Sequence, residues 1–199
     1  MRVLFLLLAI STAVFAININ KSLLQVHATL VPKISMMDYQ FDEKIKDKTI
    51  KIAIMYKDAQ YKDAKYLKQR IESRYRNGIN SYKVKSQLVS YSDIKNTDAN
   101  VYYLFPSNKQ DIKNCVTQAN NHQALTFSYL REDLKYGVMI SLNVSKKIKP
   151  LLNLEAIKMS QITLRPVLLN ISSIYMHEAG SAIESLQIRS FNIYTTEIA

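Results

Sequence analysis

Hydrophobic positions along this chain switch repeatedly between the period of a strand and the period of a helix. Residues 49–56, TIKIAIMY, place three isoleucines on one face and Ala53 and Met55 on the other, as in a strand covered on both sides. Residues 61–75 carry an apolar stripe at helical spacing that Asn77-Gly78 ends. The same reasoning predicts a helix at 23–34, strands at 82–91, 99–105 and 124–129, and a helix near 112–119 capped by Ser107 and Gln110.

The pattern changes after Gly137. Residues 138–144 alternate as a half-buried strand, a basic SKKIK run follows, and a second apolar stretch covers 150–154, which together predict a β-hairpin. A short helical stretch is expected past Asn153. Pro166 then suits the first turn of a closing helix, whose apolar run lies between Val167 and Tyr175, before Gly180.

Strands separated by helices of this length imply mainly parallel pairing with right-handed crossovers. We therefore expect an α/β fold: a single three-layer, Rossmann-like domain over residues 17–180, with a C-terminal hairpin and closing helix. A chain of 199 residues with 48% hydrophobic content can form one core of ordinary size. The remaining residues, 181–199, form a C-terminal extension to which no role is assigned.

The N-terminus has the pattern of a secretory signal. Arg2 precedes the apolar run VLFLLLAI, and Val14 and Ala16 hold the small-residue positions of a cleavage site after Ala16. A membrane anchor is the alternative, but the apolar run stops short of the roughly 20 residues that a spanning helix needs. Residues 1–16 are therefore predicted to be a signal peptide, and the mature protein is expected to be soluble and periplasmic.

Charge adds information about partners. The formal net charge of +11 becomes +10 when Arg2 is removed with the signal, and in a cytosolic protein this excess would suggest nucleic acid. Export argues against nucleic acid and favours an anionic membrane surface, an acidic cell-wall polymer or an acidic protein face. The simpler alternative is a lysine-rich, solvated surface.

Enzymatic chemistry finds little support in the residues. With three glycines in all, the chain contains no GxGxxG, GxxxxGK[ST] or GxSxG motif, and its one cysteine and three separate histidines have no metal-binding spacing. Cys115 lies on an apolar helix face and is expected to be buried, while His122 is expected to cap a helix end. Asp58 and Asp63 fit solvated first-turn acids. We predict no catalytic residue, no metal and no cofactor.

The stretch from Gly137 to Tyr175, about a fifth of the chain, resembles the YfiR-like family of small periplasmic proteins. The likeness runs without a gap from 153 to 171, and its motif residues, here with structural roles, are Gly137, Leu152-Asn153-Leu154, Ala156 and Leu168-Leu169. Arg165-Pro166 replaces the family's usual Ser-Ser, which exchanges a hydroxyl cap for a proline start. Family members often carry paired cysteines, so a disulfide switch within the chain is not expected here.

The resemblance implies a non-enzymatic periplasmic regulator that docks on the outer part of an inner-membrane signalling protein, typically a diguanylate cyclase, and modulates its output. The candidate partner-binding residues are Lys146, Lys147 and Lys149 in the basic turn, and a homodimer is possible. The alternative is a small-molecule-binding accessory protein of a transport or sensory system, with its ligand at the carboxyl ends of the parallel strands.

Overall fold

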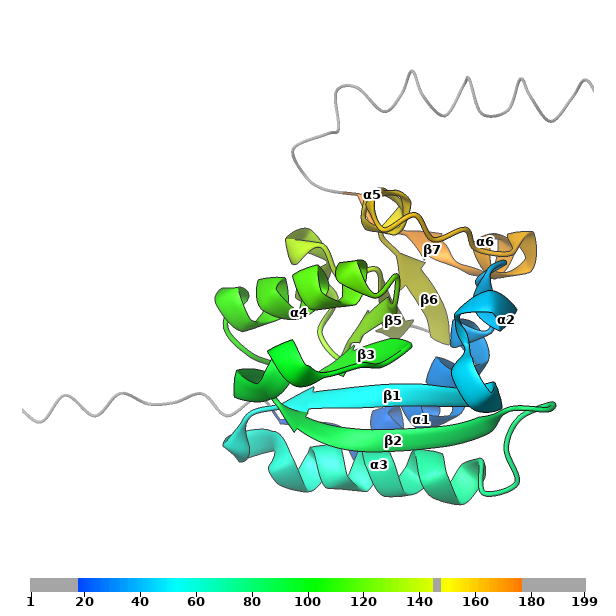
Figure 1. Cartoon of the computed structure of the whole chain (residues 1–199). Coiled ribbons are helices and arrows are strands. Elements are labelled where there is room, and N and C mark those ends of the chain that lie inside the picture. The colour runs from blue at the N-terminus through cyan, green and yellow to red at the C-terminus, as the bar shows by residue number, and fades with distance from the viewer. Residues whose placement is uncertain (1–17, 145–147, 177–199) are drawn as a thin grey trace, which may run out of the picture.

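A computed structural model describes residues 18–144 and 148–176 of the chain. Within these residues a single mixed sheet has the strand order β2-β1-β3-β4-β5-β6-β7 (Figure 1). The first five strands of this order are parallel, β6 is antiparallel to β5, and β7 is parallel to β6. The strands are β1 (Thr49–Tyr56), β2 (Lys83–Ser90), β3 (Val101–Leu104), β4 (Leu125–Ser128), β5 (Ile140–Val144), β6 (Ile148–Leu152) and β7 (Ser173–Ile174).

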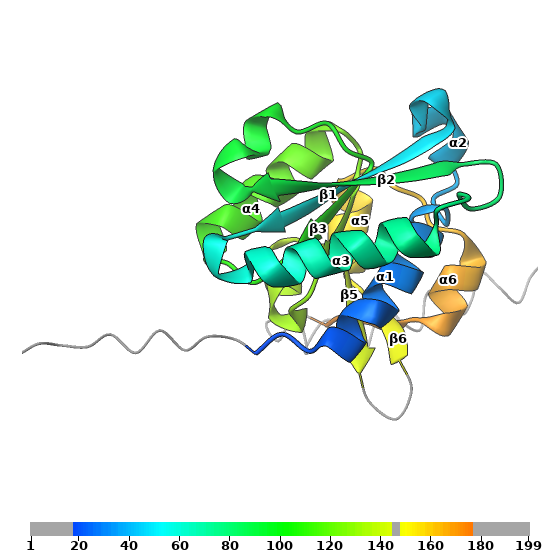
Figure 2. The same ribbon diagram turned by 90° about the horizontal axis from the view of Figure 1, so that it is seen from below.

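Helices cover both faces of the sheet, so the predicted three-layer α/β architecture is confirmed. Helices α1 and α3 lie side by side on one face and α4 lies on the other (Figures 1 and 2). The α-helices are α1 (Lys21–Ser35), α2 (Phe41–Lys44), α3 (Tyr61–Arg74), α4 (Lys109–Asn121), α5 (Leu154–Met159) and α6 (Pro166–Ile171). Short 3-10 helices are η1 (Lys46–Lys48), η2 (Asp58–Gln60), η3 (Tyr91–Asn96) and η4 (Arg131–Tyr136).

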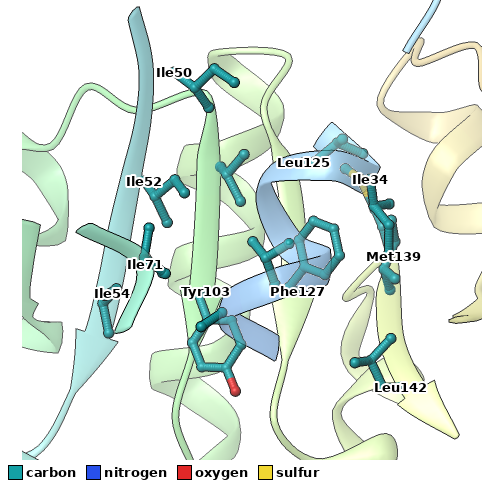
Figure 3. Close-up of a cluster of buried hydrophobic side chains, with 14 of the residues drawn as sticks. Ile34, Ile50, Ile52, Ile54, Ile71, Tyr103, Leu125, Phe127, Met139 and Leu142 are labelled. Atoms are coloured by element: carbon teal, nitrogen blue, oxygen red, sulfur yellow. The ribbon is translucent and has the colours of Figure 1, made fainter. Parts of the chain in front are cut away.

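Strand β1 has the predicted bounds and both of its faces are buried. Its isoleucines enter a cluster under α1 and α3 that includes Ile71, Tyr103 and Phe127 (Figure 3). Its other face contributes Ala53 and Met55 to a smaller cluster beneath α4. Two-sided burial requires apolar residues at successive positions, which explains the near-continuous hydrophobic run of this strand.

The hairpin and the caps around it follow from local residue chemistry. Ile140 pairs with Leu152 in the antiparallel β5–β6 ladder, and the Asn153 side chain caps α5 by accepting a hydrogen bond from the Ala156 N–H at 3.0 Å. Gly137 ends η4 with φ of 96°, a left-handed conformation that side chains rarely adopt. A Cβ atom there would lie 3.2 Å from a Val116 methyl group, so the position favours glycine twice over.

The predicted closing helix begins at Pro166 as expected but is shorter than its apolar run. Helix α6 ends at Ile171, because Ser172 adopts an extended conformation and the chain then pairs as β7 beside β6. The Tyr175 N–H donates to the Leu152 carbonyl at 2.8 Å, a bond available only next to a sheet edge. Tertiary pairing therefore overrides the helical spacing of this segment.

Three smaller predictions also need correction. Asn108, not Ser107, is the N-cap of α4, and its side chain accepts a bond from the Asp111 N–H at 2.9 Å. The Gln110 side chain does not complete a capping box, because its amide donates to Asn114. Tyr61 heads the apolar stripe of α3 but is 44% exposed, since it lies in the first turn beyond the edge of the core.

Candidate functional site

The chain reverses its direction across the sheet at β1, because β2 and β3 lie on either side of it. In open α/β sheets, ligands bind outside the carboxyl ends of the strands at such a point. Here Lys57, which follows β1, places its Nζ 2.7 Å from Asp111 Oδ2, and the Ser107 hydroxyl donates to the same oxygen at 2.5 Å. A hollow of about 330 Å³ adjoins this ion pair and is lined also by Ser90 and Lys95. It is a small polar crevice whose central charges are already paired with each other.

Titratable groups beneath α4 are buried in forms that do not favour nucleophilic chemistry. Burial raises the pKa of the Cys115 thiol to about 12, so the group remains protonated at neutral pH. Burial also raises the pKa of Asp133 to about 6, and the Ser128 hydroxyl donates to its carboxylate at 2.5 Å. Across the described part of the chain, no group of three His, Cys, Asp or Glu residues is arranged to hold a metal ion.

A second buried group lies under α1. His27 is 1% exposed, and its Nδ1 lies 2.6 Å from the Tyr103 hydroxyl, while its Nε2 has no hydrogen-bond partner in the described structure. Burial lowers the pKa of this imidazole to about 4, so the side chain is neutral at pH 7. We assign it to the core, not to a site.

A groove of about 540 Å³ lies between the outer surfaces of α1 and α3. Two hydrogen bonds show that the two helices run in the same direction. The Gln25 side chain donates to the Tyr66 hydroxyl and, further along both helices, the Tyr75 hydroxyl donates to the Thr29 carbonyl. Helix α1 contributes Gln25, Val26 and Leu30 to the lining, and α3 contributes Arg70, Ser73 and Arg74. An aliphatic wall therefore faces a guanidinium wall.

The helix layer that carries this groove is strongly basic. Helix α1 carries two lysines and no carboxylate, and α3 carries five cations against Asp63 and Glu72, which gives a net +5 for the two helices. Helix α4, on the opposite face, has two lysines and one aspartate, a net +1. Helices α1 and α3 thus carry +5 of the net charge of +11 noted in the sequence.

The structure describes one of the three predicted partner-binding lysines. Lys149 is exposed, but it belongs to β6, opposite Asn143, and not to the turn where it was expected. Lys146 and Lys147 lie outside the described residues. Lys149 is not among the residues that line the groove.

The family-motif residues occupy structural positions. Gly137 and Asn153 form the caps described above, Ala156 is buried, and Leu168 is 1% exposed in the core. Leu169 is 39% exposed. One leucine of the pair is therefore a core residue, as expected from the start of an apolar face, and the other lies at the surface.

Sequence reasoning did not identify the groove, although part of its signal was present. Arg70 and Arg74 are four residues apart, as are Val26 and Leu30, so each pair lies on one side of its helix. Nothing in the sequence indicated that α1 and α3 would be neighbours, because α2 and β1 separate them along the chain.

Comparison with known families decides the classification. The model of the YfiR/HmsC-like family matches residues 39–173, about two thirds of the chain, from just after α1 to the first residue of β7. The chain belongs to this family. YfiR/HmsC-like proteins are known as periplasmic regulators and form a regulatory, non-catalytic family. No described helix of this member is both long and apolar enough to cross a membrane.

Solved structures share the fold at low sequence identity. A conserved domain protein from Vibrio cholerae O1 biovar eltor superposes with a TM-score of 0.54 at 14% identity, covering 76% of this chain and 59% of that one. The ABC domain in complex with L-Trp from Streptococcus pneumonia gives 0.51 at 11% identity, covering 77% and 62%. This member thus spans about three fifths of each structure's length. No curated protein matches the chain.

Proposed function

We propose that the mature protein is an exported, non-enzymatic periplasmic regulator. It docks on the periplasmic part of an inner-membrane signalling protein of the diguanylate cyclase type and modulates its output. Membership of the YfiR/HmsC-like family is the observation that carries this proposal. The net charge of +5 on α1 and α3 supports it, because a basic face favours an acidic partner surface and fast, salt-dependent association.

Regulation by docking requires two states of the partner that bind this protein unequally. A regulator with equal affinity for the active and inactive cyclase would shift neither population, however tightly it bound. The protein must therefore bind one state of the cyclase more tightly than the other, and a signal must release it by changing the difference between the two affinities.

Capture from crosslinked cells tests the proposal directly. Tagged mature protein is expected to enrich one inner-membrane protein that combines a periplasmic portion with a cytoplasmic cyclase domain, and deletion of this chain's gene is expected to change the cellular cyclic di-GMP level. A tagged exported protein of similar charge serves as the control. Enrichment no greater than in that control, together with an unchanged nucleotide level, would refute docking.

Charge reversal in the basic hairpin tests whether its three lysines contact the partner. Reversal of Lys146, Lys147 and Lys149 to Glu should weaken partner binding and reduce its dependence on salt if the hairpin meets an acidic face. Titration at two salt concentrations measures both quantities. If neither changes, the hairpin is a solvated connection and docking uses another surface.

One observation favours a second candidate function, small-molecule capture: the polar crevice beside Lys57 and Asp111 lies at the position where α/β sheets bind ligands. Lys57→Ala should then abolish a ligand-induced rise in melting temperature, with a loss of about 1 kcal/mol or less in the free protein from the broken ion pair with Asp111. If no compound in a screen of periplasmic metabolites raises the melting temperature of either wild type or Lys57→Ala, the result argues against this function.

A further inference from the structure

The groove between α1 and α3 combines two chemically different walls at matching spacing. Val26 and Leu30 are half-buried on α1 and pack on the main core, so their outer atoms form a fixed aliphatic strip. Arg70 and Arg74, one helical turn apart on α3, are exposed on the opposite wall. A ligand that fills this groove must present an apolar face and, beside it, negative charges about one helical turn apart.

Arg70 is held in place by its neighbours. Its Nε donates to the Tyr66 hydroxyl at 3.1 Å, and its guanidinium lies 5.2 Å from the centre of the Tyr66 ring. The Gln25 amide donates to the same hydroxyl at 2.8 Å, which ties this arrangement to α1. These bonds leave the terminal guanidinium nitrogens available and reduce the entropy lost when they bind a carboxylate.

Nothing acidic in the described structure neutralises this wall. The groove lining contains no Asp or Glu, and no carboxylate of the described residues lies within ion-pair distance of Arg70 or Arg74. Glu72, the one glutamate of α3, is paired with Lys68 at 2.5 Å. Two arginines that face a hollow without an internal counter-charge are suited to carboxylates supplied by another molecule.

We infer that this groove is the docking site for an acidic amphipathic helix from the periplasmic part of the partner. The inference rests on the proposed function and names the surface that performs it. The partner helix places aliphatic side chains on Val26 and Leu30, and its carboxylates, at i and i+4, pair with Arg70 and Arg74. A helix bound along the groove can place side chains one turn apart against Arg70 and Arg74 and apolar side chains against Val26 and Leu30 at the same time. A flat lipid surface would not enter the groove to contact the aliphatic strip.

A matched pair of charge reversals separates the groove from the general charge of the face. The test variant is Arg70→Glu with Arg74→Glu; the control is Lys62→Glu with Lys65→Glu, the same change of charge on exposed residues of α3 that do not line the groove. All four side chains are at the surface, so both variants should melt within about 3 °C of wild type. Arg70→Lys with Arg74→Lys keeps the charge and removes the paired guanidinium geometry.

Capture of the partner by each mature protein is then quantified. We expect the groove variant to lose about tenfold or more in affinity, the lysine variant to lose less, and the control to lose less than about threefold. Equal losses in the groove variant and the control would mean that only overall charge matters, and unchanged capture by the groove variant would mean that docking occurs elsewhere. Both results overturn the inference while docking itself stands. If wild type captures no inner-membrane protein, the proposed function and the inference fail together.

A photo-reactive residue at Ser73, on the groove wall, identifies what occupies the groove in cells. Gln69, exposed on α3 but not in the lining, is the control position. An adduct at position 73 with an acidic helical peptide of the partner supports the inference. An adduct with lipid, or with a second copy of this chain, contradicts it.

Discussion

His27 allows a prediction in which stability depends on pH through one buried side chain. Its pKa falls from the ordinary value of 6.5 to about 4 because it is buried. In the unfolded chain the imidazole takes up a proton near pH 6.5, whereas in the folded protein it resists protonation until about pH 4. The unfolded state therefore binds more protons between these values, so the stabilisation is complete above pH 6.5 and is lost as pH falls towards 4.

A shift of 2.5 pKa units corresponds to about 3 kcal/mol of unfolding free energy at 1.36 kcal/mol per unit. His27→Phe cannot take up a proton, so wild type should lose about 3 kcal/mol relative to this variant between pH 7.5 and pH 4. Urea unfolding followed by circular dichroism at four pH values measures the difference. His122→Asn, which removes an exposed histidine, is the control. If the difference in unfolding free energy between wild type and His27→Phe is the same at every pH, His27 is not held neutral by burial.

The hydrogen bond to Tyr103 extends this prediction at constant pH. Tyr103→Phe leaves Nδ1 of His27 buried without its partner, in addition to Nε2, and should cost about 1–3 kcal/mol. Changing both residues to Phe removes the buried polar groups together and should cost less than the sum of the single changes. Additive losses would mean that the 2.6 Å contact contributes nothing specific.

Three further predictions concern the core beyond α1. Leu168→Ala should lower the free energy of unfolding by about 2–5 kcal/mol, because Leu168 is fully buried. Leu169 is 39% exposed, so Leu169→Ala should cost under about 1 kcal/mol. Equal losses in thermal melts would contradict the assigned burial. Burial raises the pKa of Asp133 from 3.8 to about 6, so between these pH values the folded protein keeps a proton that the unfolded chain has lost. Wild type therefore loses stability as the pH rises through this range, and Asp133→Asn should be more stable than wild type by up to about 3 kcal/mol at pH 7.5. Urea titrations should show that this gain vanishes below pH 4. Because Cys115 is buried, melts with and without dithiothreitol should coincide, and a reductant-sensitive dimer that Cys115→Ser abolishes would show the opposite.

Individual elements show how far residue patterns can predict this fold. The limits of β1 were predicted without error because a strand buried on both faces must be apolar at nearly every position. The caps at Gly137 and Asn153 depend on backbone conformation and on bonds within three residues, which local sequence specifies. The segment after Ile171 was predicted as helix, and it became β7 because the edge of β6 offers its backbone partners that the local pattern does not describe.

The same division applies to function. The family motif, the single cysteine and the positive charge are properties of the sequence, and they are sufficient for the classification and for the expectation of a regulator. The groove is a product of tertiary structure, since Val26 and Leu30 become opposite to Arg70 and Arg74 only when α1 and α3 pack together on the sheet. Sequence periodicity determines which side of each helix a residue occupies, because that depends on 3.6 residues per turn. Which helix lies beside it depends on how two distant segments share one sheet face, and the folded chain alone decides that.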